Sequence, residues 1–182
     1  FSMWQYTNLF GSWNHAIFQA PGCWVDAAHR LGTDIFSGIK FFESWTAGSG
    51  AGNWCALIST KNADGTYKYT KALINILMFF GSDGINYNFE DTGYSNADVV
   101  AFHKSLYKEA AAQGFDNFHI GIYTANSSLT AAYKEALFGS TDTGKTADLM
   151  LNYSGGDFTS TNAMRSSVQT AEAAMGTCEG LY

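Results

Sequence analysis

Residues 83–90 read Asp-Gly-Ile-Asn-Tyr-Asn-Phe-Glu and follow a helical pattern that ends at Gly81. Side chains alternate between the two faces of a β-strand, so Asn86, Asn88 and Glu90 share one face of the strand expected here. Polar groups on one face of an apolar strand are costly to bury unless they have partners. A carboxylate at the end of a strand, with two amides behind it, therefore predicts a catalytic acid with supporting groups. The alternative is a polar network that only fills a barrel, or an edge strand that faces water.

The rest of the chain repeats an order of helix, glycine and strand. Apolar residues at helical spacing, each run ended by a glycine, predict helices over 21–31, 67–80, 95–114, 128–138 and 161–175. Short apolar runs between them predict strands over 9–13, 34–42, 83–90, 118–123 and 148–153. Strands that alternate with helices predict an α/β fold with a parallel sheet and right-handed crossovers.

Two α/β architectures fit this order, the closed (β/α)8 or TIM barrel and the open doubly wound sheet. No glycine-rich phosphate loop follows any predicted strand, which disfavours a nucleotide-binding sheet. Polar and aromatic residues gather instead at the C-terminal ends of the strands, where barrel enzymes build their sites. These residues are Trp13, His15, Glu43, Trp45, Glu90, Tyr123, Asn152 and Tyr153. The TIM barrel is therefore the preferred prediction.

The length of the chain predicts that only part of a barrel is present. A complete barrel of this class has about 250 residues, whereas the chain has 182. It ends at Leu181-Tyr182, where another strand is expected after Gly176. We therefore predict one partial TIM-barrel catalytic domain over residues 1–182, with about five βα units, lacking one strand in front and two behind.

Composition disfavours several classes of partner. A net charge of −6 and a pI near 5.0 argue against nucleic acid or an anionic membrane, and no apolar run is long enough to span a bilayer. Aromatic residues make up 16% of the chain, which suits stacking on sugars, although most phenylalanines are better explained as core. The three cysteines are odd in number and form no CxxC pattern, so buried free thiols are expected. Neither a metal nor a cofactor is predicted.

The single carboxylate of the 83–90 strand indicates a particular glycosidase mechanism. Glycoside hydrolysis usually needs two carboxylates, but Asn88 stands where a partner of Glu90 is expected. In a substrate with a 2-acetamido group, the acetamide oxygen can attack the anomeric carbon, while Asn88 holds the acetamide. Glu90 then acts first as acid and later as base, and Tyr123 on the next strand is a second hydrogen-bonding group for the acetamide. If Glu43 faced Glu90, the ordinary two-carboxylate mechanism would return.

Asp83-Gly84 followed by Asn88-Phe89-Glu90 resembles the Asn-x-Glu signature of glycoside hydrolase family 85, the endo-β-N-acetylglucosaminidases. Four further segments are similar to the family: Trp4-Gln5-Tyr6, Ala27-Ala28-His29-Arg30, Phe42-Glu43-Ser44-Trp45 and Leu151-Asn152-Tyr153. The resemblance covers most of the chain. It implies a TIM barrel that cleaves between the two core N-acetylglucosamines of N-linked glycans, with retention and through an oxazoline intermediate.

Carried over by position, the resemblance makes Asn88 the group that orients the acetamide, Glu90 the acid/base and Tyr123 the supporting phenol. The Tyr123 match is weaker, because the family tends to have Asp at the next position, where this chain has Thr124. The strand also fits the Asp-x-x-Asp-x-Asp-x-Glu spacing of family 18, but Asn86 and Asn88 replace both middle aspartates. A chitinase-like hydrolase of N-acetylglucosamine polymers and a non-catalytic glycan-binding barrel therefore stay as alternatives, although retention of Glu90 favours an enzyme.

The remaining candidates are substrate contacts. They are Asn86, Trp13, His15, Trp45, Asn152 and Tyr153. The aromatic members are sugar platforms or packing at the barrel rim, and His15 either touches a hydroxyl or is structural. His29 and Asp83 are expected to be structural. The expected partner is an N-glycan or glycoprotein, a substrate class that favours a secreted or cell-surface protein over a cytosolic one; the oligomeric state is not predicted.

Overall fold

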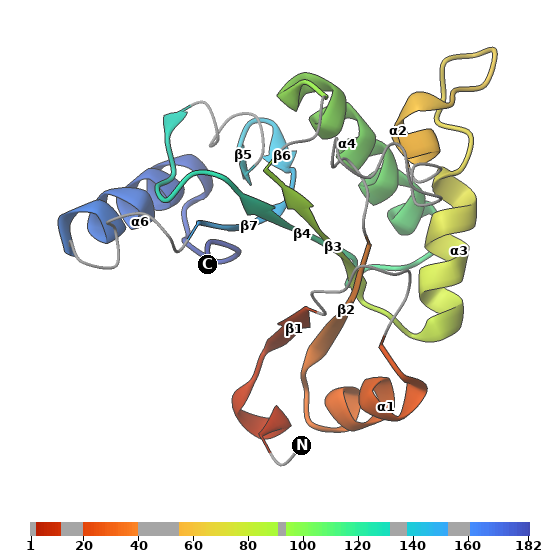
Figure 1. The fold of residues 1–182 in the computed structure, drawn as a ribbon, viewed down its shortest axis with the longest axis horizontal. Coiled ribbons are helices and arrows are strands. Elements are labelled where there is room, and N and C mark those ends of the chain that lie inside the picture. The colour runs from red at the N-terminus through yellow and green to blue at the C-terminus, as the bar shows by residue number, and fades with distance from the viewer. Residues whose placement is uncertain (1–2, 12–19, 40–54, 91–93, 132–137, 153–160) are drawn as a thin grey trace.

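The structure is a computed structural model that describes residues 3–11, 20–39, 55–90, 94–131, 138–152 and 161–182. Five parallel strands form one sheet in the order β1-β2-β3-β4-β7 (Figure 1). Their bounds are Leu9–Gly11 (β1), Asp34–Gly38 (β2), Gly84–Phe89 (β3), His119–Thr124 (β4) and Asp148–Met150 (β7). The sheet curls into half a barrel, which confirms the α/β class and the five expected strands. The closed eight-stranded form stays a prediction.

Helices pack along one face of this sheet, here called the outer face (Figure 1). They are α1 (Gly22–Arg30), α2 (Ala56–Ser59), α3 (Thr70–Phe80), α4 (Asn96–Ala112) and α6 (Thr161–Met175), and a 3-10 helix, η1 (Trp4–Tyr6), precedes β1. The expected helix over 128–138 lies largely outside the described residues. No helix of the described part of the chain is both long and apolar enough to cross a membrane.

The end of α3 and the start of α4 carry residue types that favour helix termini. The Ser95 hydroxyl oxygen accepts a hydrogen bond from the Asp98 backbone N–H at 3.1 Å and caps α4. Gly81 ends α3 in the left-handed conformation, with φ of 69°, which costs glycine little because it has no Cβ. The cap and the glycine stop fix where the chain leaves α3 for β3 and where it enters α4.

One local prediction was wrong, and one feature was not predicted. The helix predicted to begin at residue 67 begins at Thr70, because Tyr67 pairs with Lys61 in an isolated antiparallel bridge and packs its ring against Phe102. These contacts of Tyr67 outweigh the helical preference that the apolar spacing of the following residues indicates. The short antiparallel pair β5 (Gly139–Ser140) and β6 (Gly144–Lys145) was not predicted, since strands of two residues carry no readable alternation.

The expectation that all three cysteines are buried was also wrong. Cys23 and Cys178 are exposed, Cys55 is half-buried, and all three are free. Cys23 lies on α1, which turns Val25 and Ala28 towards the core instead. A helix buries only one stripe of its surface, so an apolar residue type alone did not decide the side on which Cys23 lies.

The main core lies between the outer face of β3 and β4 and the helices α3 and α4. Alternate residues of β3 contribute Ile85, Tyr87 and Phe89 to it. The predicted stripe of α4 is fully buried there and consists of Val99, Phe102, Leu106 and Ala110. Burying a large apolar side chain of this kind contributes about 1.5–3 kcal/mol, so this packing holds β3 with its other face turned inward.

One polar chain crosses this core. The Tyr87 hydroxyl contacts Nε2 of His103, and Nδ1 of His103 lies 3.0 Å from the backbone oxygen of Thr146. A carbonyl can only accept, so Nδ1 carries the proton and Nε2 accepts from the phenol. The pair ties β3 to α4 and to the segment that leads into β7. Burial lowers the pKa of His103 to about 3, although the bond to Thr146 acts in the opposite direction.

This buried neutral histidine predicts a loss of stability in acid. Below pH 6.5, the ordinary pKa of histidine, His103 becomes protonated in the unfolded chain but stays neutral in the folded chain. The free energy of unfolding should therefore fall as pH drops from about 6.5 towards 3, by up to about 1.4 kcal/mol per pH unit. Denaturant unfolding of the wild type and of His103→Gln at pH 6.5 and 4.5 measures the effect. The variant should lose less stability over this interval, and equal losses would contradict the assignment.

Candidate active site

The strand register decides which side chains meet on the inner face of the half-barrel. Asn86 of β3 is level with Gly121 of β4, and Asn88 is level with Tyr123. Residues paired across parallel strands point to the same side of a sheet. The amides of β3 and the phenol of Tyr123 therefore share the inner face, away from the helices. In β7, Met150 is level with Tyr123 and continues this row.

Glu90 follows β3 directly and is exposed at the C-terminal edge of the sheet. The amide Nδ2 of Asn88 donates to its Oε2 at 3.0 Å. The amide Nδ2 of Asn152, which follows β7, donates to its Oε1 at 3.3 Å. The carboxylate is thus held between two amides, one from its own strand and one from two strands away.

The bond between Asn88 and Glu90 leaves an acceptor without a partner. Because Nδ2 of Asn88 is turned to the carboxylate, Oδ1 is its remaining polar atom, and this oxygen is buried and accepts no hydrogen bond. Oδ1 of Asn86, one row lower on the same face, is in the same condition. A buried acceptor without a donor costs about 1–3 kcal/mol. A bound molecule that supplied N–H or O–H groups here would remove that cost.

A cavity of about 150 Å³ opens on the inner face below this rim. Its lining includes Phe36, Asn86, Gly121, Tyr123, Asp148 and Met150. Two glycines of the lining let neighbouring side chains approach closely: a Cβ on Gly121 would lie 3.3 Å from the Phe36 ring, and one on Gly11 would lie 3.0 Å from Nδ2 of Asn86. Phe36 and Asn86 therefore pack against glycine backbone at this level of the inner face.

At the other end of the strands lies a charged network centred on His119. Its Nδ1 lies 3.1 Å from Oδ2 of Asp148, and its Nε2 lies 3.2 Å from Oδ1 of Asn117 and 3.5 Å from Oδ2 of Asp34. Lys145 Nζ is 2.7 Å from the other oxygen of Asp148. Both ring nitrogens of His119 therefore face oxygen acceptors, as a protonated imidazole requires.

The network shifts two pKa values in opposite directions. The hydrogen bond with Asp148 and the nearby carboxylates raise the pKa of His119, against burial and the charge of Lys145. For Asp148, burial raises the pKa, but the hydrogen bond from His119 and the charge of Lys145 outweigh it, and the net pKa is lowered. Both groups are therefore held in their charged forms. Within the described part of the chain, no group of three His, Cys, Asp or Glu side chains is arranged to hold a metal ion.

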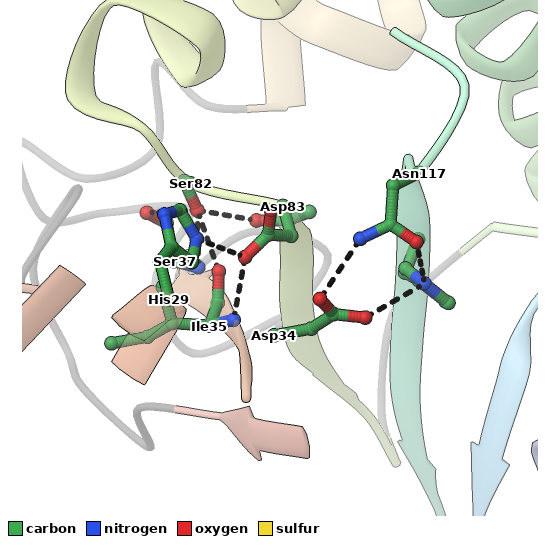
Figure 2. A network of polar contacts seen from close by, with 9 residues as sticks. His29, Asp34, Ile35, Ser37, Ser82, Asp83 and Asn117 are labelled. Carbon is green, nitrogen blue, oxygen red and sulfur yellow. Dashed lines mark hydrogen bonds and ion pairs between the residues drawn. The ribbon is translucent and has the colours of Figure 1, made fainter. Parts of the chain in front are cut away.

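Asp83 anchors the start of β3, as predicted. Figure 2 shows its carboxylate beside His29 and Ile35, where Oδ2 accepts from the backbone N–H of Ile35 at 2.8 Å and from Nε2 of His29 at 2.7 Å. Beside it, the buried Ser82 hydroxyl accepts from the backbone N–H of Ser37 at 3.0 Å. These contacts fix the height of β3 relative to β2, and with it the row in which each inner side chain lies.

The structure brings together part of the set predicted from the sequence. Asn88, Glu90 and Asn152 meet at the rim, Tyr123 is level with Asn88, and Asn86 lines the cavity below. The other candidates, Trp13, His15, Glu43, Trp45 and Tyr153, lie outside the described residues. The sequence reading missed His119 and gave no role on the inner face to Asp148. The register that places both there, with Gly84 level with His119 and Gly121 level with Asp148, is not contained in the predicted strand bounds.

A curled parallel sheet with an acid and amides at the carboxyl ends of its strands has the site position of barrel enzymes. Residues 1–138 match the family model of glycosyl hydrolase family 85. The chain belongs to this family, and is thereby assigned to the glycoside hydrolases. The matched segment contains Asn88, Glu90 and Tyr123 but ends before β7 and Asn152. A search of curated proteins returned no match to the chain.

The charge of His119 predicts that stability falls in alkali. Since the folded pKa is raised above 6.5, the stabilising contribution is complete below pH 6.5 and is lost as pH rises through the folded value. Urea unfolding of the wild type and of His119→Gln at pH 6 and pH 9 tests this. The wild type should lose more stability than the variant over this interval. Parallel losses would show that His119 is not held in its protonated form.

Proposed function

We propose that this chain carries the active site of an endo-β-N-acetylglucosaminidase that hydrolyses the GlcNAc-β-1,4-GlcNAc core of N-linked glycans. The strongest support is the side-chain amide of Asn88. Its Nδ2 donates a hydrogen bond to Glu90, and its buried Oδ1 has no hydrogen-bond donor. An acetamide N–H is the donor that such an acceptor needs. Membership in family 85 gives the reaction class to which this pairing belongs.

In the first step of the proposed reaction, the acetamide N–H of the substrate donates to Oδ1 of Asn88. The acetamide oxygen forms a bond to the anomeric carbon as the bond to the leaving sugar breaks, and Glu90 gives its proton to the leaving oxygen. Positive charge develops on the acetamide, which strengthens its hydrogen bond to Asn88. Stabilisation that grows towards the transition state accelerates the reaction. The Tyr123 phenol is the proposed second group on the acetamide.

In the second step, the carboxylate of Glu90 removes a proton from water, and the oxygen of that water bonds to the anomeric carbon. The bond between that carbon and the acetamide oxygen breaks, which restores the acetamide and retains the configuration. Two inner-face carboxylates, Asp34 and Asp148, face His119, and Asp148 also pairs with Lys145. Because these partners already engage them, they support a mechanism in which the substrate, rather than Asp34 or Asp148, supplies the nucleophile. We also propose that residues 1–182 form part of a (β/α)8 catalytic domain.

Glu90→Gln tests the acid/base role. Glutamine keeps the size of the side chain and its acceptor oxygen but has no proton to give, so hydrolysis should fall by at least about 10²-fold. A high-mannose glycoprotein is incubated with the wild type or the variant, and mass spectrometry measures the mass of the glycan that remains on it. A single N-acetylglucosamine left on asparagine, with the wild type only, is the expected result. A glycoprotein left intact while chitin oligomers are cleaved would favour the chitinase-like alternative.

Asn88→Ala tests the acetamide contact. Removing a group that stabilises charge in the transition state should lower the hydrolysis rate by about 10²–10³-fold. A preformed oxazoline donor bypasses the step in which the acetamide attacks. The variant should therefore lose less of its activity on this donor than on the glycoprotein substrate. Asn75→Ala, at an exposed position of α3, is the matched control and should behave as wild type. An Asn88→Ala protein that hydrolyses glycoprotein at the full rate would overturn the mechanism.

A further inference from the structure

Asn152 makes a contact that a sugar-binding role does not need. Its amide reaches Glu90 across β4, between positions 62 residues apart in the sequence. Its backbone N–H donates to the oxygen of Asn126 at 2.8 Å, and the N–H of Leu151 donates to the oxygen of Tyr182 at 2.7 Å. The backbone on which the amide stands is therefore held on both sides before any substrate binds.

Each oxygen of the Glu90 carboxylate has its own amide donor. Asn88 holds Oε2 at 3.0 Å and Asn152 holds Oε1 at 3.3 Å. A carboxylate held at one oxygen can still turn about its last bond, whereas one held at both has a fixed plane. Each oxygen has two lone pairs, so the amides leave a lone pair on each for a transferred proton.

We propose that Asn152 is a positioning residue for hydrolysis, which fixes the carboxyl plane of Glu90 so that its proton points at the leaving oxygen. This role rests on the proposed function of Glu90 as the acid. It differs from the substrate contact expected from the sequence, because Asn152 acts through Glu90 and not through the sugar. Misplacing a catalytic group by about 1 Å can cost on the order of 10²-fold in rate. Loss of the second amide that holds Glu90 should therefore lower the rate measurably.

The choice of leaving group distinguishes two roles for Asn152, positioning Glu90 and binding sugar. A sugar leaves poorly without a proton, whereas 4-nitrophenolate leaves readily without one, so only the first substrate depends strongly on an oriented acid. Asn152→Ala is compared with wild type on an N-glycan and on the same glycan carrying 4-nitrophenol at the scissile bond. Single-turnover release of each leaving group isolates the step in which Glu90 acts as acid.

With the N-glycan, Asn152→Ala should lower kcat by about 10–100-fold with KM nearly unchanged. With the nitrophenyl substrate, the single-turnover rate should fall by less than about 3-fold, because acid assistance contributes little there. Asn152→Leu keeps much of the volume of the side chain and removes the donor without adding a charge, so it should show the same difference between substrates. Asn75→Ala should match wild type on both.

Other outcomes overturn the proposal in distinguishable ways. If Asn152→Ala raises KM on both substrates and leaves kcat unchanged, the residue binds sugar and does not position Glu90. If Asn152→Ala and Asn152→Leu both equal wild type on both substrates, the contact has no role in the reaction. If the wild type releases neither leaving group while it is folded, the proposed function itself fails, and the role of Asn152 fails with it.

Discussion

The register of β3 against its neighbours is the constraint on which the rest of the structure depends. Side chains alternate along a strand, so a slip of one residue would turn Asn86 and Asn88 to the helices and bring Tyr87 to the inner face. Gly84 permits this register, because a Cβ there would lie 2.1 Å from the backbone oxygen of His119, with which Gly84 is level. Asp83 adds a bond to the N–H of Ile35 in β2. The position of every inner group follows from these few backbone contacts.

Much of the fold could be read from the sequence because its signals are local. Apolar spacing and glycine stops gave the strands and most helices, and Ser95 marked the start of α4. The alternation of the 83–90 stretch correctly separated the faces of β3. The gathering of polar residues at strand ends placed Asn88, Glu90 and Asn152 in one region, because parallel strands end at the same edge.

Contacts between distant segments could not be read in the same way. The network of His119 with Asp148 depends on how β4 and β7 align, which no short window of sequence contains. Tyr67 left its expected helix for a pairing with Lys61. The bond from Asn152 to Glu90 joins residues that the sequence predicts separately, Asn152 as a sugar contact and Glu90 as the acid. In each case the physical cause is a tertiary contact, and periodicity records only which face of an element is apolar.

The two ends of the inner face treat their polar groups in opposite ways. At the end near His119, charged partners satisfy one another, and this network ties β2, β4 and β7 together. At the end near Glu90, Asn88 keeps a buried acceptor without a donor, and so does Asn86 in the row of Asp148, at about 1–3 kcal/mol each. Stability alone would replace such groups with apolar ones. Sites that violate local rules of this kind are characteristic of function, and the proposed substrate would supply the missing donor. The His119 network therefore stabilises β2 and β4, the two neighbours of β3, and β3 carries the acceptors that are proposed to bind the substrate.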